Sequence, residues 1–294
     1  MKQNDFVYQS RPGRVVFGAG SLQHLERELL ALGATRALVL AAPDQRPTAA
    51  DIASRLGERC AGIFDRVVMH VPIEVAREAQ ALARTLSADC VIAFGGGSSI
   101  GLGKAIALNS GLRILAIPTT YAGSEMTPIF GLTEAGVKRT GTDLKVLPRT
   151  VIYDPELTMT LPAEMSVASG MNALAHAAEG LYAQDANPIT SLMSEEAIGA
   201  LARGLRGVTR DANDIGARTD ALYGAARGHG AGRRRHGAAP QAVPHARRQL
   251  QPAPRADARR DVAARPGLQR QSSPRRDGAR RARAWCPPCG AGCL

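Results

Sequence analysis

Short apolar runs alternate with stretches of helical spacing over the first half of the chain. We predict buried strands for the runs 14–17, 37–40, 67–69, 91–94, 114–117 and 151–153. Between them the spacing is helical, as in the helix that Ser21 would cap, with Leu22, Leu25, Leu29 and Leu30 on one side. This alternation predicts a parallel sheet that is covered by helices on both faces.

A glycine turn, Gly95, Gly96 and Gly97, follows one of these runs directly, and Ser98 begins a predicted helix. A turn without side chains lets an anion approach the backbone, and the first turn of a helix offers free N–H groups. The pattern favours a site for the pyrophosphate of a dinucleotide, and an ordinary tight turn is the alternative. It fits neither the G-x-G-x-x-G fingerprint nor an ATPase phosphate loop, since the residue after Lys104 is not the Ser or Thr that would hold magnesium.

Hydroxyl side chains are frequent in the loop 118–127, which follows the next predicted strand. They suit hydrogen bonding to a phosphate, a ribose or a nicotinamide amide, although a polar turn with helix caps has the same composition. Ligands of parallel sheets bind at the carboxyl ends of the strands, where the glycine turn lies and where this loop begins. We therefore expect both segments to face one site.

The strand pattern stops at residue 156, and helical spacing over 161–182 and 188–205 predicts an all-helical region. Asn172 and His176 are four residues apart and share one face of the first of these helices, and Glu179 lies near His176. A satisfied structural histidine is the alternative to a role in a site.

The formal net charge of +11 divides unevenly along the chain. Residues 225–294 hold 16 of the 37 Lys and Arg, all of them Arg, and 3 of the 26 Asp and Glu, which leaves 21 basic and 23 acidic residues in 1–224. The segment 225–294 also contains no Ile, Met, Phe, Tyr or Lys, so we predict a disordered tail. An Arg-rich tail that binds nucleic acid is the functional alternative, although the aromatic residues of single-strand binders are missing apart from Trp285.

Two further features concern the cellular setting. Cys60 and Cys90 are the only cysteines before residue 225, which favours a reducing compartment. The first residues lack the apolar segment of a signal peptide, and no apolar run has the length of a membrane span. We therefore expect a cytoplasmic protein with no membrane partner.

Three stretches together, 95–98, 118–125 and 170–179, resemble the iron-containing (group III) alcohol dehydrogenase superfamily in their order and spacing. Within it, 15–20 and 119–127 are similar to the branch of maleylacetate reductases. The resemblance implies an α/β fold: a Rossmann-like parallel-sheet nucleotide domain over 1–155, the start of an all-helical substrate domain over 156–224, and then the tail 225–294.

The activity that the resemblance implies is an NADH- or NADPH-dependent reduction of the C=C bond of maleylacetate, a small dianion, to 3-oxoadipate by a homodimer, without a nucleic-acid partner. Many relatives place an acidic residue near Ala42 to bind the adenosine ribose, and the lack of a carboxylate there predicts that NADPH is accepted beside NADH. The implied cofactor-binding residues are Gly96, Gly97 and Ser98 at the pyrophosphate and Thr119, Thr120, Tyr121, Thr127 and Ile129 around the rest of the nucleotide.

Metal-dependent members of the superfamily carry Asp-x-x-x-His on the helix where this chain has Asn172 and His176. A neutral amide is a poor replacement for a carboxylate at a divalent ion, so the expectation is that no metal is bound. Asn172 and His176 then become candidates for hydrogen bonding or proton delivery to the substrate. A metal-dependent alcohol or polyol dehydrogenase of the same superfamily is the alternative function.

The resemblance stops near residue 224, and a frameshift near 224–228 in GC-rich DNA would explain the tail. With suitable synonymous codons, the segment 236–245 read one base later gives M-A-L-H-H-K-L-C-H, which resembles the family's missing His-bearing helix. Under this hypothesis His229, His236 and His245 do not correspond to the family's downstream site histidines. A chain without that part of the helical domain lacks half of the cleft wall, which predicts loss of activity.

Overall fold

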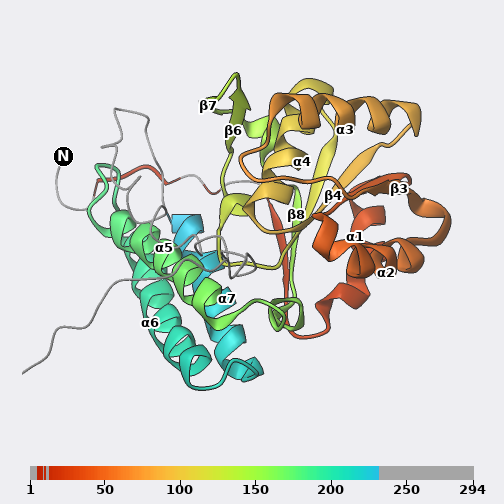
Figure 1. Ribbon diagram of the computed structural model, residues 1–294. Coiled ribbons are helices and arrows are strands. Elements are labelled where there is room, and N and C mark those ends of the chain that lie inside the picture. The colour runs from red at the N-terminus through yellow and green to blue at the C-terminus, as the bar shows by residue number, and fades with distance from the viewer. Residues whose placement is uncertain (1–4, 9, 11–12, 232–294) are drawn as a thin grey trace, which may run out of the picture. The chain divides into compact units, whose positions relative to one another are not determined.

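The computed structural model describes residues 5–8, 10 and 13–231 and contains a six-stranded parallel sheet in the order β1-β8-β5-β4-β2-β3 (Figure 1). The strands are β1 Arg14–Phe17, β2 Ala37–Leu40, β3 Cys60–Phe64, β4 Cys90–Gly95, β5 Arg113–Pro118 and β8 Thr150–Tyr153. The central strands β2 and β4 are completely buried, which explains their unbroken apolar sequences. The prediction of an α/β fold with a parallel sheet is confirmed.

Helices cover both faces of this sheet and form two apolar clusters with it. One face packs against α1 and α2, and the other against α3 and α4. The helices are α1 Leu25–Ala31, α2 Arg46–Leu56, α3 Ile73–Thr85 and α4 Gly97–Ser110, with short 3-10 helices at Ser21–His24, Pro43–Gln45, Gly57–Arg59, Ser124–Met126, Leu144–Val146 and Pro155–Thr158. α4 contacts the sheet on one side and helix α3 on its other side, so most residues of α4 are buried.

Three details of the predicted pattern are wrong. Ser21 does not cap its helix, because its hydroxyl donates to the Tyr153 carbonyl. Residues 67–69 are not a strand, because the third strand along the chain is β3, and the backbone turns at His70 and Val71, whose φ values are +66° and +46°. Leu30 is 45% exposed rather than part of the apolar side of its helix, because α1 ends one residue later.

An antiparallel hairpin that the sequence analysis did not identify projects from the sheet domain. It consists of β6 Ile129–Glu134 and β7 Val137–Thr142. Thr133 fastens the hairpin to the loop before α3, because its N–H donates to the Val71 carbonyl and its hydroxyl to the His70 carbonyl. β7 is almost entirely exposed, which is why its sequence carries no apolar signal.

Three long helices follow the sheet domain: α5 Ala163–Leu181, α6 Pro188–Arg210 and α7 Ile215–Ala231. The prediction of a helical region after the sheet is confirmed. Asn187 begins α6 with a capping box, in which its side chain accepts from the Thr190 N–H and the Thr190 hydroxyl accepts from the Asn187 N–H. Arg218 of α7 is fully buried and donates to the carbonyls of Thr158 and Leu161, so it joins α7 to the segment before α5.

The boundary of the predicted tail needs correction. Residues 225–231 continue α7, because Ala225 and Ala226 pack into the same apolar cluster as α5 and α6 and alanine favours helix. The expectation of disorder after residue 231, and the statement that His236 and His245 do not correspond to the family's site histidines, concern residues outside the described part of the chain. Among the described helices, none combines the length and apolar character needed to cross a bilayer.

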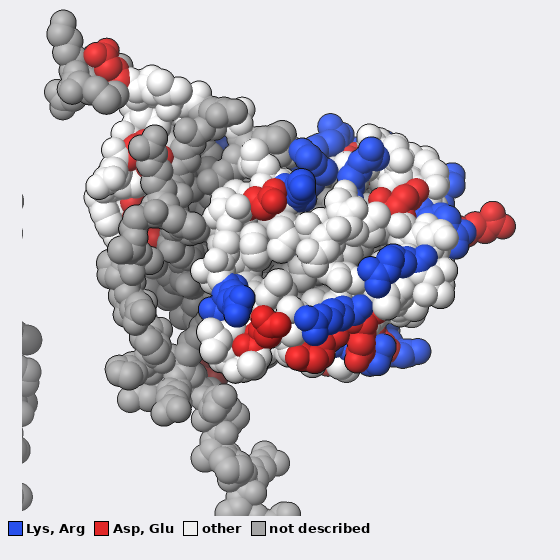
Figure 2. Space-filling model, turned by 90° about the horizontal axis from the view of Figure 1, so that it is seen from above, with Lys and Arg blue, Asp and Glu red and all other residues white. Residues whose placement is uncertain are grey.

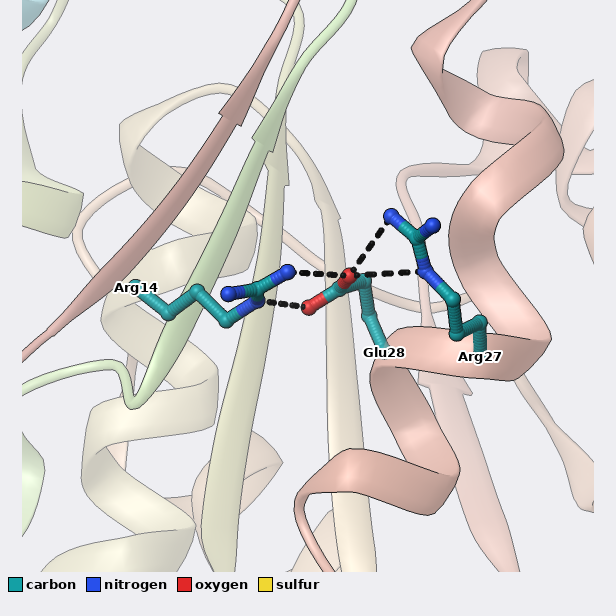
Figure 3. A network of polar contacts seen from close by, with 3 residues as sticks. All are labelled: Arg14, Arg27 and Glu28. Atoms are coloured by element: carbon teal, nitrogen blue, oxygen red, sulfur yellow. Dashed lines mark hydrogen bonds and ion pairs between the residues drawn. The ribbon is translucent and has the colours of Figure 1, made fainter.

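Glu28 of α1 is a buried carboxylate held between two arginines (Figure 3). Its oxygens accept from Arg14 Nε at 2.5 Å and Arg14 Nη2 at 3.1 Å, and from Arg27 Nη2 at 3.2 Å. The hydrogen bonds and charge of Arg14 hold the pKa of Glu28 below its ordinary value, even though burial acts in the opposite direction. The interaction fastens β1, at the edge of the sheet, to α1.

We expect Glu28→Gln to lower the melting temperature by a few degrees at neutral pH. A carboxyl with a lowered pKa stabilises the fold above its unfolded pKa and loses that contribution as the pH falls through the folded pKa. The difference between wild type and variant should therefore shrink in acid. Glu26→Gln is the matched control, because Glu26 lies on the same helix as Glu28 but forms an exposed pair, with Arg59, and its substitution should change little. An unfolding difference for Glu28→Gln that does not vary with pH would contradict this account.

Candidate functional site

The glycine turn connects β4 to α4 at the carboxyl edge of the sheet. Gly95 has a φ of +128°, and a Cβ at this position would lie 2.5 Å from Gln45 Oε1, so only glycine fits. The Thr119 N–H donates to the Gly95 carbonyl at 3.1 Å, which ties the ends of β4 and β5 together. Gly96 precedes α4 in an extended conformation, and no described side chain caps the helix. The exposed Gly97 therefore presents backbone N–H groups to an anion.

The two threonines after β5 lie against this turn. Thr119 is almost buried, and its hydroxyl accepts from Gln45 Nε2 at 3.1 Å. Thr120 is half-buried and lies beside Gly96, where an added Cβ would be 3.2 Å from Thr120 Cγ2. The structure thus brings together the predicted pyrophosphate residues and the first hydroxyls of the predicted nucleotide loop.

Tyr121 lies in a different environment from the one that the resemblance implies. Its side chain is fully buried in the apolar cluster that also contains Leu201 and Leu222 of the helical region. Its N–H donates to Ser169 Oγ of α5 at 3.1 Å, and its hydroxyl has no hydrogen-bond partner among the described residues. Tyr121 therefore joins the loop to the helices, and its ring lines no open surface.

The remaining predicted nucleotide residues, Thr127 and Ile129, are half-buried and lie where the loop enters β6. Their carbonyls both accept hydrogen bonds from the Lys104 ammonium of α4. The loop is therefore fixed from the same helix whose first turn carries the glycines.

Asn172 and His176 occupy successive turns of α5, as predicted. Asn172 is exposed and His176 is half-buried, with His176 Nδ1 3.3 Å from Glu179 Oε2. His229 of α7 lies beside His176, with a ring centroid 4.8 Å from that of His176. The same ring packs so closely on Gly123 of the loop that a Cβ there would overlap it. The loop thus contacts His229 as well as the glycine turn.

One side of α5 is open and largely apolar. Met165 and Met171 are more than half exposed, and Tyr182 beyond the end of the helix is 76% exposed. Met165, seven residues before Asn172, shares its row of α5, and Met171 lies on the adjacent exposed row. The candidate substrate residues therefore border an apolar surface.

On the face shown in Figure 2, the described Lys and Arg side chains are interspersed with Asp and Glu around a mostly uncharged centre. Such an interspersed pattern is unlike the continuous basic stripe of a nucleic-acid surface. The Arg-rich segment on which the nucleic-acid alternative rests lies almost wholly beyond the described residues.

Four residues of the site were missed by the sequence analysis as site residues: Gln45, Lys104, Ser169 and His229. Gln45 and Ser169 carry no sequence signal, since each acts through one hydrogen bond to a distant segment. Lys104 stands two turns after the glycines in an otherwise apolar helix, which is a signal for a buried, functional cation. His229 was set aside with the tail, although it lies on α7 and beside His176.

Two family models match the chain in succession. One is described as iron-containing alcohol dehydrogenase and matches residues 12–155, and the other is described as the C-terminal part of the Fe-containing alcohol dehydrogenase family and matches 166–238. These matches correct the expectation that no metal is bound, because members of this family contain iron and a metal cofactor is therefore expected. The neutral Asn172 was too narrow a basis for that expectation.

The described residues do not by themselves fit a complete iron site. His176 is a suitable ligand and His229 lies close to it, but no group of three or more His, Cys, Asp or Glu side chains in the described part of the chain is arranged to hold a metal ion.

Known proteins of high similarity span more than this chain does. The maleylacetate reductase of Burkholderia cepacia is 61% identical over 222 residues, which cover 76% of this chain and 63% of the relative. The crystal structure of maleylacetate reductase from Agrobacterium tumefaciens has a TM-score of 0.76 at 50% identity. This match covers 78% of this chain and 65% of that one. An iron-containing alcohol dehydrogenase from Corynebacterium glutamicum has a TM-score of 0.74 at 47% identity, with 77% of this chain covering 64% of that one. The matched models, the identities and the common fold show that the chain belongs to the iron-containing alcohol dehydrogenase family.

Proposed function

We propose that the chain is a maleylacetate reductase that uses NADH or NADPH to reduce the C=C bond of maleylacetate to 3-oxoadipate. The observation that carries this proposal is the 61% identity over 222 residues to a protein of that name. The chain spans about 63% of that relative's length, and the activity of the whole enzyme is proposed for this chain. A homodimer and a cytoplasmic setting are part of the same proposal.

The glycine turn supports the nucleotide half of the proposal. Gly96, Gly97 and Ser98 leave the N-terminus of α4 open to a pyrophosphate, and Thr119 and Thr120 lie directly beside them. Thr127 and Ile129 would follow along the nucleotide toward the nicotinamide. Tyr121 would contribute by holding the loop on α5.

A reduced nicotinamide, when bound, supplies the hydride. Hydride addition to one alkene carbon leaves an enolate, which needs a proton at the other carbon. The half-buried His176 would deliver this proton, with Glu179 orienting its ring through Nδ1, and Asn172 would hydrogen-bond the substrate. The exposed row of α5 would form one wall of the substrate site.

The first test is nucleotide oxidation by the purified chain with fresh maleylacetate, followed through the loss of nicotinamide absorbance with NADH and then NADPH. We expect His176→Asn to lower kcat by about 100-fold, as for loss of a general acid, and Asn172→Ala chiefly to raise KM. His70→Asn is the control, because His70 is exposed and has a positive φ that Asn tolerates. Oxidation of simple alcohols or polyols without reduction of maleylacetate would favour the alternative dehydrogenase and overturn the proposal.

The nucleotide site is tested separately by Gly97→Ala. An added Cβ meets only Ala122 Cβ, at 3.6 Å, so the fold should be kept while the methyl group obstructs the helix N-terminus. We expect the dissociation constant for NADH to rise by about tenfold or more, measured by nucleotide fluorescence.

Gly199→Ala is the control for this variant. It adds the same methyl group in α6, where it meets Arg203 Nη1 at 3.5 Å, and should leave NADH binding unchanged. Equal NADH affinity of Gly97→Ala and wild type would contradict a pyrophosphate site at this turn.

A further inference from the structure

The Lys104 side chain is fully buried inside the sheet domain. Its ammonium donates to the carbonyls of Ser124 at 2.6 Å, Thr127 at 2.7 Å and Ile129 at 2.7 Å, and the Thr127 hydroxyl lies 3.3 Å away. Three carbonyls match the three N–H donors of an ammonium group. All of them belong to one short segment, 124–129, which we call the anchored loop.

The position of Lys104 relates the anchored loop to the glycine turn. α4 begins at Gly97, and Lys104 follows seven residues later, which is about two helical turns. One rigid helix therefore presents its N-terminal N–H groups at one end and holds the anchored loop further along. The segments at the two ends of the proposed nucleotide site are fixed to the same element.

A second buried contact fixes the anchored loop from the sheet. The Tyr153 hydroxyl of β8 donates to Glu125 Oε1 at 2.7 Å, and Glu125 is almost completely buried. Burial raises the pKa of the Glu125 carboxyl, whereas the Tyr153 hydrogen bond and the nearby Lys104 charge act in the opposite direction. The loop is thus held between a cation on α4 and a hydroxyl on β8.

Burying an ammonium group is costly, and an apolar side chain of similar volume such as Met would avoid the cost. A cost of this kind is understandable where the hydrogen bonds select one conformation of a connecting segment. The anchored loop joins the 3-10 helix Ser124–Met126 to the start of β6, and it contains Thr127 and Ile129, two of the residues proposed to line the nucleotide site.

We infer that Lys104 is a positioning residue for the nicotinamide nucleotide, which keeps the anchored loop in register with the glycine turn without touching the ligand itself. This inference rests on the proposed function. It assigns Lys104 a role distinct from that of the phosphate-binding lysine in ATPase loops, because its ammonium points to backbone carbonyls of the same domain.

The test compares Lys104→Met and Lys104→Gln with wild type and with Ile52→Ala. Met removes every donor, Gln restores two N–H donors on a shorter side chain, and Ile52→Ala destabilises the core on the opposite face of the sheet. NADH affinity is measured by fluorescence, and hydrogen exchange is followed by mass spectrometry for peptides covering 124–129.

We expect Lys104→Met to bind NADH about tenfold more weakly than wild type, and the NADH affinity of Lys104→Gln to lie between the two. In both lysine variants, hydrogen exchange should accelerate in 124–129 more than in β4 or β5. Ile52→Ala should lower the melting temperature while the folded protein keeps its NADH affinity. If Lys104→Met does not fold, the comparison of Lys104→Gln with Ile52→Ala decides the question in the same way.

Two outcomes would overturn the inference: NADH affinity of the lysine variants that falls no further than that of Ile52→Ala, or exchange that accelerates evenly over the domain. Failure of the proposed function has a different signature, because the wild-type chain itself would then bind neither NADH nor NADPH. The exchange measurement still shows in that case whether Lys104 fixes the loop.

Discussion

The burial of the sheet on both faces is the constraint on which the rest of the structure depends. Strands β2 and β4 have no exposed residue, so their polar neighbours can lie only at the strand ends. A parallel sheet directs the carboxyl ends of its strands to one edge, and the glycine turn and the loop after β5 meet there. The position of the candidate site follows from how the apolar strands are buried, before any ligand is considered.

The loop after β5 connects the parts of this edge through contacts of different kinds. Thr119 is tied to the end of β4, Tyr121 packs among the helices, and Gly123 accommodates the ring of His229. The carbonyls further along are held by Lys104. The segment between β5 and β6 therefore acquires a defined conformation from α4, α5 and α7 together.

Much of the fold could be predicted because it has a strong local signal. The central strands are short unbroken apolar runs between helical stretches, and the three consecutive glycines that begin at Gly95 are typical of a sharp turn. β3 was misplaced because its sequence, Cys-Ala-Gly-Ile-Phe, is small and partly exposed, whereas the later run that includes Val67 looks more strand-like. The hairpin β6–β7 was missed because its second strand is exposed and lacks alternation.

The candidate site was predictable only where motif and element coincide. The glycine turn and the pair on α5 were identified because one follows a strand and the other has helical spacing. Gln45, Ser169 and His229 act on segments far away in the sequence, and no local pattern reports such contacts. The limits of the two domains stay a prediction. The metal expectation failed because it was read from one position, Asn172, whereas membership of the family rests on more than two hundred residues.

The open row of α5 has a consequence for the chemistry of its sulfur atoms. Met171 directly precedes Asn172, and Met165 lies about two turns before Asn172 on the same side of the helix as Asn172. Exposed thioethers are oxidised by peroxide to polar sulfoxides, whereas covered ones react slowly. The rate of sulfoxide formation at these two methionines therefore reports whether any surface closes over the helix that bears His176.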